Sequence, residues 1–402
     1  MTSNNLILER NIDSIYPSQN KLLTKLQGEK KLKIYLGIDP TSPEIHIGNA
    51  VALWKLREFQ DQGHQVTLLI GDFTGMIGDP SDKTSLRKSL TKTEVDQNAQ
   101  KYKEQASKIL NFSGANPAKI EYNSKWLSKM SLEQIIELAA NFSVQQLIER
   151  DMFQKRLSEH KTIRLHEFIY PILQGYDSVA MEVDIEVGGT DQTFNMLIGR
   201  NLLKVLKNKE KFVVTLPLLE GVDGRKMSKS YGNTINITDR PNEMYGKIMS
   251  IKDEFIAKYF ELCTDFSSDQ INKIKSQLNK KSVNPMELKK TLAYEIVKRY
   301  HDEKESKIAK EEFKRVFQQG EQTTNLTEVT LSRKILPISI AALAKKVGAT
   351  TSVSAAIKLA GNKGLKLNGS IVYNPREDLS KLDNSETIID IGKRRSIKIF
   401  WE

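Results

Sequence analysis

Two short motifs in the N-terminal half carry side chains suited to binding phosphate. His46-Ile47-Gly48-Asn49 follows a predicted strand and opens a predicted helix, whose N-terminus offers unpaired N–H groups and partial positive charge. His46 adds a hydrogen bond to phosphate oxygens, and Gly48 lets a ligand approach the backbone closely. A histidine that only caps the helix is the alternative, and four residues taken alone favour it.

The second motif is Lys226-Met227-Ser228-Lys229-Ser230, in a glycine-flanked stretch that suits a mobile loop. Lys226 and Lys229 are suited to neutralising charge that builds on a pyrophosphate leaving group. An exposed basic loop is the usual alternative for a lysine pair. However, this pentapeptide arises by chance in about one chain of this length in ten thousand. Its pairing with the first motif therefore favours a phosphate site.

The elements that position these motifs alternate between strand and helix. Residues 31–39 and 65–74 read as strands around a helix over 49–63, which is a β-loop-α-β unit of a parallel sheet. Further segments are strands over 119–123, 181–187 and 211–219 and one long helix over 131–153. The predicted fold class is therefore α/β, with a Rossmann-like parallel sheet over residues 1–240.

The sequence pattern changes after Pro241, where helical periodicity replaces the alternation of strand and helix signals. Residues 241–330 read as a helical domain that ends in a polar linker over 318–330. Residues 331–402 read as a separate small α+β domain. It is predicted to contain helices over 338–348 and 352–364, a hairpin turn at Asn368-Gly369, and a final pair of strands over 387–392 and 396–401.

Charge and composition narrow the class of protein. The 402-residue chain has a net charge of +11, and residues 331–402 hold 13 basic against 6 acidic side chains. Such a basic module suggests that the partner is a polyanion, and RNA or DNA is favoured over a membrane surface. The alternative is a basic surface that only keeps the protein soluble. No stretch is apolar enough to span a membrane, and the polar N-terminus lacks a signal-peptide core. We therefore expect a cytoplasmic location and no membrane partner.

Neither cysteine nor histidine predicts a protein-bound metal such as zinc. The single Cys263 excludes an intrachain disulfide and a multi-cysteine metal cage, and it reads as a buried apolar residue in a helix. His64, His160, His166 and His301 do not have the spacing of metal ligands.

The two motifs resemble the signatures of class I aminoacyl-tRNA synthetases. The intervening stretches YLGIDPT, TGMIGDPSDK, YPILQGYD and GGTDQ resemble the tyrosyl-tRNA synthetase family of that class, and the tail resembles its S4-like RNA-binding domain. The resemblance implies activation of L-tyrosine with ATP and Mg²⁺, release of pyrophosphate, and transfer of tyrosine to the 3′ end of tRNA(Tyr). It also implies a homodimer. The helical domain would then contact the anticodon region.

A tyrosine pocket also follows from the residues. Tyr170, Gln174 and Asp177 are spaced i, i+4, i+7 on one predicted helix face, where a polar pocket and a solvated face are the alternatives. Pro171 must lie in the first turn of that helix or kink it. The resemblance implies the following contacts: Tyr35 and Asp177 with the substrate phenol, Asp79, Tyr170 and Gln174 with its ammonium, and Gln192 near its carboxylate.

The resemblance also assigns the residues of the nucleotide site. The implied catalytic residues are Thr41, His46, Lys226 and Lys229. The implied ATP-binding residues are Gly37, Asp39, Gly48, Asn49, Gly189, Asp191, Lys226, Met227, Lys229 and Ser230. Lys83 and Arg87 are expected near the pyrophosphate. One departure is Asn49, where the family signature usually has histidine, although asparagine can donate a hydrogen bond of similar reach.

Two other functions are open at this point. The sister tryptophan enzyme shares the fold and signatures, although Asp177 with Tyr35 favours a phenol substrate. A non-catalytic RNA-binding protein built on a former synthetase is the second. The residues that argue against it are the intact His46, Asp79, Lys226 and Lys229.

Overall fold

The computed structural model describes residues 7–28, 30–81, 91–318, 326–379, 386–392 and 395–402. Contacts divide the chain into two compact units, residues 1–239 with 250–292 and residues 240–249 with 293–402. The first unit contains a six-stranded sheet and the second a five-stranded sheet. Among the helices of the described ranges, none has both the length and the apolar character that a membrane span requires.

The sheet of the first unit confirms the predicted parallel α/β fold. Its strand order is β1-β6-β5-β2-β3-β4, in which β1 pairs antiparallel with β6 and the other neighbours are parallel. The strands are β1 (Ser14–Tyr16), β2 (Lys33–Ile38), β3 (Gln65–Ile70), β4 (Lys119–Tyr122), β5 (Ile185–Gly189) and β6 (Phe212–Leu216). Most residues of β3, β5 and β6 are buried, as expected of a parallel sheet covered on both faces.

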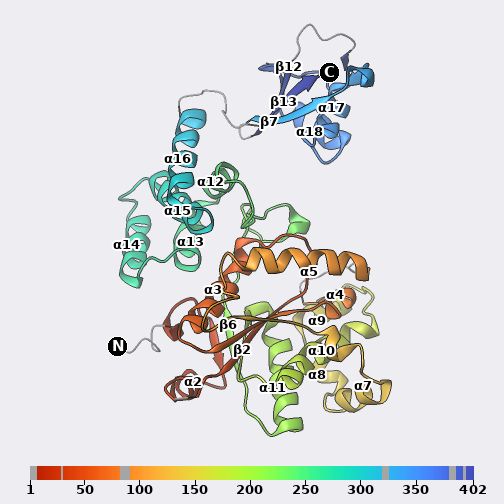
Figure 1. The fold of residues 1–402 in the computed structure, drawn as a ribbon, viewed down its shortest axis with the longest axis vertical. Helices are drawn as coiled ribbons and strands as arrows, with labels where there is room; N and C mark the ends of the chain where they lie inside the picture. The colour runs from red at the N-terminus through yellow and green to blue at the C-terminus, as the bar shows by residue number, and fades with distance from the viewer. Residues whose placement is uncertain (1–6, 29, 82–90, 319–325, 380–385, 393–394) are drawn as a thin grey trace. The chain divides into compact units, whose positions relative to one another are not determined.

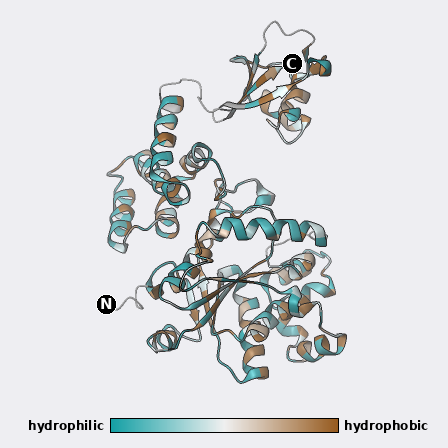
Figure 2. Ribbon diagram, viewed as in Figure 1, coloured by the Kyte–Doolittle hydropathy of each residue, from teal (hydrophilic) through white to brown (hydrophobic). Residues whose placement is uncertain are grey.

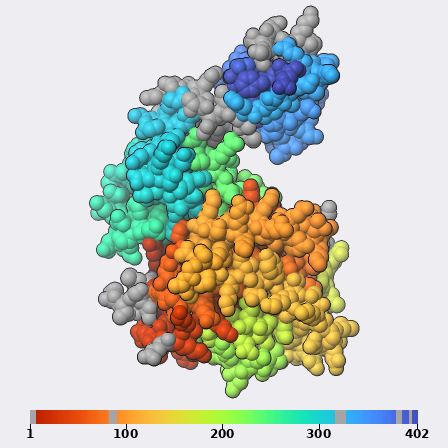
Figure 3. Space-filling view, viewed as in Figure 1, coloured from red at the N-terminus to blue at the C-terminus, as the bar shows by residue number. Residues whose placement is uncertain are grey.

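Helices cover both faces of this sheet (Figure 1). Helices α3 (Ile47–Asp61) and α5 (Lys92–Ala106) lie on one face, and α10 (Leu165–Met181) and α11 (Thr193–Lys207) lie on the other. Right-handed crossovers explain this, because the chain moves from β2 to β3 in one direction and from β5 to β6 in the opposite one. Figure 2 shows α5 as mainly hydrophilic, and in Figure 3 the orange segment that contains it forms much of the drawn surface of this unit.

The remaining helices of the first unit are short. They are α2 (Gln19–Leu26), α4 (Thr74–Ile77), α6 (Ser124–Leu127), α7 (Leu132–Ala139), α8 (Val144–Ile148), α9 (Asp151–Ser158), η1 (Thr190–Gln192), η2 (Lys229–Tyr231), η3 (Asp253–Phe255), α13 (Ile256–Cys263) and α14 (Ser268–Asn279). Cys263 in α13 is buried, which confirms that expectation.

Several predicted boundaries in this unit were wrong. The strand expected over 65–74 ends at Ile70, and the one expected over 211–219 ends at Leu216. The single helix expected over residues 131–153 is three helices, α7, α8 and the start of α9. It breaks because Ser143 has extended backbone and its side chain accepts a hydrogen bond from Gln146 N, which starts a new helix. The strand expected from Met181 begins at Ile185, because α10 continues to Met181 and ends at Glu182 in the left-handed region.

The direction of the sheet connections reverses between β2 and β5. These two strands are parallel neighbours, with Leu36 opposite Val187. Ligands of open α/β sheets bind where the carboxyl ends of strands meet at such a reversal. Asp39 directly follows β2 and Asp191 lies just after β5. The fold therefore brings the segments of two predicted motifs, YLGIDPT and GGTDQ, to one edge of the sheet.

The second unit begins with helices. Helices α12 (Pro241–Met249) and α16 (Glu303–Gln318) pack together, with the rings of Tyr245 and Phe313 5.4 Å apart. The helix α15 (Pro285–Tyr300) starts in the first unit and ends in the second. The sequence pattern after Pro241 predicted helices, and these helices agree with it.

A small mixed sheet completes the second unit. The strand order is β10-β9-β12-β13-β7, and β8 and β11 form a separate pair. The strands and helices of this C-terminal part are β7 (Leu326–Leu331), η4 (Arg333–Ile335), β8 (Ile338–Ser339), α17 (Ile340–Lys346), α18 (Val353–Gly361), β9 (Leu365–Leu367), β10 (Ser370–Ile371), β11 (Asp378–Leu379), β12 (Glu386–Ile391) and β13 (Arg395–Trp401). Its buried apolar residues form their own cluster, which includes Leu343, Ile389 and Ile399.

Most of the predictions for this tail are confirmed, and one is corrected. Asn368 and Gly369 both have positive φ, 49° and 82°, as the two-residue turn between β9 and β10 requires. The linker predicted over 318–330 is wrong at its C-terminal end, because Leu326–Leu331 form β7 and pair in parallel with β13. Alternating leucine, threonine and valine in that segment suit a strand.

Candidate active site

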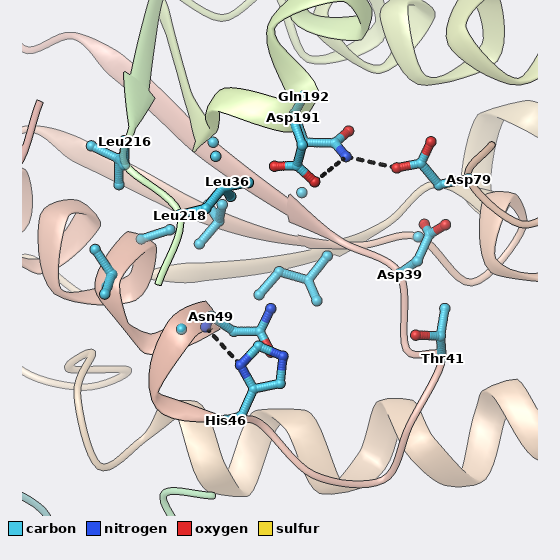
Figure 4. A pocket seen from close by; sticks show the side chains of 18 of the residues that line it. Leu36, Asp39, Thr41, His46, Asn49, Asp79, Asp191, Gln192, Leu216 and Leu218 are labelled. Carbon is cyan, nitrogen blue, oxygen red and sulfur yellow. Dashed lines mark hydrogen bonds between the residues drawn. The ribbon is translucent and has the colours of Figure 1, made fainter. Parts of the chain in front are cut away.

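A pocket of about 870 Å³ lies in the first unit, at the carboxyl ends of β2 and β5. Every predicted site residue except Ser230 lines it. The side chain of Ser230, together with Lys83 and Arg87, lies outside the described part of the chain. Figure 4 shows His46 and Asn49 on one side of the pocket and Asp191 and Gln192 across from them. The structure thus brings together residues as distant in the sequence as Tyr35 and Lys229.

His46 both caps helix α3 and lines the pocket. Its Nδ1 accepts a hydrogen bond from Asn49 N at 3.2 Å, so a neutral ring carries its proton on Nε2. A Cβ at Gly48 would lie 3.0 Å from His46 Nδ1, so glycine leaves room for the ring. Burial, and then the nearby charge of Lys226, lowers the pKa of His46 to about 4. The ring is therefore a neutral hydrogen-bond donor at pH 7.

The second motif lies against the same pocket. Lys226 Nζ donates to Asp191 Oδ2 at 2.8 Å, and both side chains are partly buried. Lys229 is exposed at the start of η2 and also lines the pocket. The loop therefore holds one lysine on the carboxylate that follows β5 and a second lysine at the pocket's edge.

Asn233 organises this loop, and sequence reasoning missed it. Its side chain is buried, accepts from Ser228 N at 2.8 Å, and donates to Asp223 Oδ1 at 2.7 Å and Lys226 O at 3.1 Å. A Cβ at Gly221 would lie 2.4 Å from the Asn233 side chain, so glycine at that position leaves space for the amide.

The residues expected at the substrate phenol are buried at the inner part of the pocket. Tyr35 and Asp177 are 1% and 2% exposed, and both line it. Asp177 accepts from Trp126 Nε1 at 2.8 Å and from Asn123 Nδ2 at 3.3 Å. Burial raises the pKa of both the Asp177 carboxyl and the Tyr35 hydroxyl. Trp126 and Asn123 lie in and before the short helix α6, where no spacing signal in the sequence marked them.

The residues expected at the substrate ammonium form a second polar group. Gln192 Nε2 donates to Asp79 Oδ2 at 2.6 Å, as Figure 4 shows. Tyr170 Oη donates to Asp39 Oδ2 at 2.8 Å. Asn195, which sequence reasoning missed, donates to Gln174 Oε1 at 2.8 Å. The three side chains expected at the ammonium, Asp79, Tyr170 and Gln174, therefore each have a hydrogen-bond partner that orients them.

The helix face predicted from the i, i+4, i+7 spacing exists. Tyr170, Gln174 and Asp177 all lie on α10 and line the pocket, so the polar pocket and not the solvated face is correct. Pro171 lies inside the helix and not in its first turn. Gly175, on the same helix, packs against α11, since a Cβ there would lie 2.8 Å from Ile198 Cγ2.

Comparison with known proteins identifies the family. The family model described as tRNA synthetases class I (W and Y) matches residues 26–318. The chain is 44% identical to tyrosine–tRNA ligase of Haemophilus influenzae, over 98% of this chain and 95% of that one. It is 42% identical to the enzyme of the same name from Thermotoga maritima, over 98% and 96%. The chain belongs to the tyrosyl-tRNA synthetase family.

Solved structures of other tyrosyl-tRNA synthetases share the fold. The Archaeoglobus fulgidus enzyme, complexed with L-tyrosine, matches with a TM-score of 0.61 at 21% identity, over 77% of this chain and 98% of that one. The truncated mitochondrial enzyme of Aspergillus nidulans matches with a TM-score of 0.64 at 21% identity, over 79% and 94%. At these identities the likeness concerns the fold.

Within this tyrosyl-tRNA synthetase, His46 is expected to titrate far below an ordinary histidine. Its pKa of about 4 in the folded state is lower than the 6.5 of an unfolded chain. The folded protein therefore binds fewer protons, and this contribution to stability is full above pH 6.5 and falls as the pH drops toward 4. NMR titration of the His46 ring, assigned with His46→Asn, measures this pKa. A midpoint above pH 6 would contradict the expectation.

Asn233→Ala is expected to slow adenylate formation by about 10- to 100-fold, because each lost hydrogen bond of a buried amide costs about 1–2 kcal/mol. Tyrosine affinity should change little, since the hydrogen bonds of Asn233 go to the loop and not to Tyr35 or Asp177. Stopped-flow measurement of adenylate formation, beside the dissociation constant for tyrosine, checks both. Asn141→Ala, at an exposed asparagine after α7, is the control. Equal rates in the two variants would contradict the role of Asn233.

Proposed function

We propose that this chain activates L-tyrosine with ATP and transfers it to tRNA(Tyr). The observation that carries the proposal is one pocket lined by both signature motifs and by the pair Tyr35 and Asp177. A phenol hydroxyl can bond both of those buried groups, whereas phenylalanine would deprive each of them of the bond to the ligand and of water, at a cost of about 1–3 kcal/mol each.

The first step needs no covalent intermediate with the protein. The tyrosine carboxylate attacks the α-phosphate of Mg·ATP, the bond to the β-phosphate oxygen breaks, and pyrophosphate leaves. Thr41 and His46 would bind phosphate oxygens, and Lys226 and Lys229 would neutralise the charge that develops on the leaving group. Positioning and electrostatic stabilisation supply the rate in this scheme.

The nucleotide would lie along the carboxyl ends of β2 and β5. Gly37, Asp39, Gly48, Asn49 and Gly189 line the pocket there. The remaining members proposed for ATP binding are Asp191, Lys226, Met227, Lys229 and Ser230. Asp191 has room for ribose hydroxyls beside Lys226, because a carboxylate offers about four acceptor sites.

The amino acid would lie deeper in the pocket. Its ammonium would contact Asp79, Tyr170 and Gln174, and its carboxylate would lie near Gln192. We propose that Mg²⁺ arrives with the ATP phosphates. Within the described ranges, no three His, Cys, Asp or Glu side chains gather as a protein metal site requires.

The second step would transfer tyrosine to tRNA. The terminal ribose hydroxyl of the tRNA attacks the adenylate carbonyl, and AMP leaves. We propose that residues 1–240 catalyse both steps, that residues 241–330 contact the anticodon region, and that residues 331–402, together with β7, bind RNA through their excess of basic side chains. We propose a cytoplasmic location for this reaction.

A homodimer is proposed as the working assembly. Large apolar side chains are exposed on neighbouring segments of the first unit, where Leu132, Ile136 and Val144 are 73%, 59% and 65% exposed. A second copy of the chain would remove this surface from water. Sedimentation equilibrium of the wild type and of Ile136→Asp tests it. Twice the chain mass for the wild type and a shift toward one chain mass for the variant are expected, and a monomeric wild type would refute it.

The test of the proposed reaction is amino-acid-dependent ATP–pyrophosphate exchange on the purified full chain. Tyrosine should stimulate exchange, and tryptophan and phenylalanine should not. Stimulation by tryptophan would indicate the sister enzyme. Absence of exchange with every amino acid would indicate a non-catalytic RNA-binding protein.

A further inference from the structure

A buried cation lies beside the tyrosine that the proposed function assigns to the substrate phenol. Lys211 Nζ donates to Ser178 Oγ at 2.7 Å and forms an ion pair with Glu186. Ser178 Oγ lies 2.9 Å from Tyr35 Oη. Lys211 and Ser178 have no exposed surface, and Tyr35 and Glu186 are 1% and 3% exposed. Three buried polar side chains thus connect to Tyr35, and two of the four, Tyr35 and Glu186, line the pocket.

The structure leaves dedicated space for this ammonium group. A Cβ at Gly199 would lie 2.7 Å from Lys211 Nζ and 2.8 Å from Ser178 Oγ. Gly199 is on α11, Ser178 on α10, and Lys211 directly precedes β6. A long basic side chain at a strand end usually extends to solvent, so its full burial beneath two helices is costly unless each charge is paired. Here Glu186 supplies the paired charge.

The hydrogen-bonding capacities of these side chains indicate the direction of donation, from Lys211 to Ser178 and from Ser178 to Tyr35. A lysine ammonium can only donate, so Ser178 Oγ accepts from Lys211 and its own hydrogen points elsewhere. Tyr35 Oη at 2.9 Å is nearer to Ser178 Oγ than Glu186 Oε2 at 3.4 Å, and Glu186 already binds Lys211. The shorter contact favours donation from Ser178 to Tyr35, so the Tyr35 hydrogen goes to another acceptor: either Glu186, which also interacts with this hydroxyl and is already paired with Lys211, or a ligand in the pocket.

Asp177 supplies the complementary group. Its carboxylate accepts from Trp126 and Asn123 and has further acceptor sites. A phenol that donates its hydrogen to Asp177 presents its oxygen as an acceptor. A Tyr35 hydroxyl that donates its hydrogen to the phenol oxygen would therefore complement Asp177. A Tyr35 hydroxyl that accepts would compete with Asp177 for the single hydrogen of the phenol.

We propose that Lys211, through Ser178, orients the Tyr35 hydroxyl as a donor toward the phenol oxygen of tyrosine, and that Lys211 and Ser178 are therefore positioning residues for the choice of tyrosine over phenylalanine. This proposal rests on the proposed function, because it assigns roles only within a tyrosine-activating site. Lys211 and Ser178 contact no substrate atom in it and act through Tyr35.

A double-mutant cycle tests the proposal on the full chain. Ser178→Ala, Tyr35→Phe and the double variant are compared with the wild type by kcat/KM for pyrophosphate exchange with tyrosine and with phenylalanine. Ser178→Ala is expected to lower the tyrosine-to-phenylalanine ratio about tenfold, the size of one oriented hydrogen bond. In the Tyr35→Phe background the same change should alter the ratio less than about twofold, since the coupling passes through the Tyr35 hydroxyl. The KM for ATP should stay constant in all four enzymes.

The outcomes separate this inference from the proposed function. No tyrosine-dependent exchange by the wild type refutes the proposed function. Exchange by the wild type with an unchanged ratio in Ser178→Ala, or with an equal loss in both backgrounds, overturns the inference and leaves the network a purely structural ion pair. Ser178→Cys keeps a side chain of the same connectivity with a slightly larger atom and weakens the hydrogen bond, so an intermediate ratio is expected even if the alanine variant folds poorly. An unchanged ratio in Ser178→Cys as well overturns the inference.

Discussion

Lys229→Ala is expected to slow tyrosyl-adenylate formation by about 10²–10³-fold while the dissociation constant for tyrosine stays unchanged. Lys229 is exposed at the start of η2 and lines the pocket, whereas Tyr35 and Asp177 line it as buried residues. Its charge would act on the leaving pyrophosphate, which gains negative charge only as the reaction proceeds. Removal of such an interaction lowers the rate and leaves ground-state binding intact.

Single-turnover adenylate formation and equilibrium tyrosine binding measure the two quantities separately. Lys207→Ala is the matched control, because Lys207 also lies in the first unit but pairs with Glu182 at the surface, outside the pocket. The control should retain both the rate and the affinity. A similar loss of rate and of affinity in Lys229→Ala would contradict the proposed role of this lysine.

Deletion of residues 319–402 is expected to lower tRNA charging by more than about a hundredfold and to leave pyrophosphate exchange within about twofold of the wild type. The deletion removes the whole five-stranded sheet, including β7, and with it a basic module. The buried apolar cluster of that sheet draws its residues from 329–401, so its loss opens no core elsewhere. The pocket residues all lie before the deletion.

The cut after Gln318 follows from the structure. A cut at Leu331 would leave β7 without its partner β13 and expose an unpaired strand. The assays are aminoacylation of tRNA(Tyr) and tyrosine-dependent exchange on the same preparation, the first at several salt concentrations. Full-length charging should fall as salt rises. Full charging by the deletion variant would refute the assignment of the tail to RNA binding.

The sequence was informative where local chemistry decides the outcome. The β-loop-α-β unit followed from alternating and helical periodicity, and the Asn368-Gly369 turn followed from two residues that tolerate positive φ. Tyr170, Gln174 and Asp177 share a helix face because their spacing is helical, so their convergence in the pocket was predictable. The single helix predicted over 131–153 was wrong, because the helix cap at Ser143 is a weak signal within an apolar pattern.

Contacts made across the fold were not predictable in this way. Trp126 and Asn123 reach Asp177 from more than fifty positions earlier in the chain, and only tertiary packing brings them there. Lys211 opens the strand predicted over residues 211–219, and nothing in its sequence surroundings marks it for burial. Its burial depends on the close crossing of α10 and α11 at Gly175 and Gly199, which no periodicity in the sequence reports.

The central claim is that the buried pair of Tyr35 and Asp177 recognises the phenol of the substrate. A crystal structure of this chain with bound L-tyrosine tests it most directly. The claim predicts the phenol oxygen within about 3.2 Å of both Tyr35 Oη and a carboxylate oxygen of Asp177. A ligand whose ring lies elsewhere in the pocket, or an Asp177 side chain turned away from the phenol, would contradict the account.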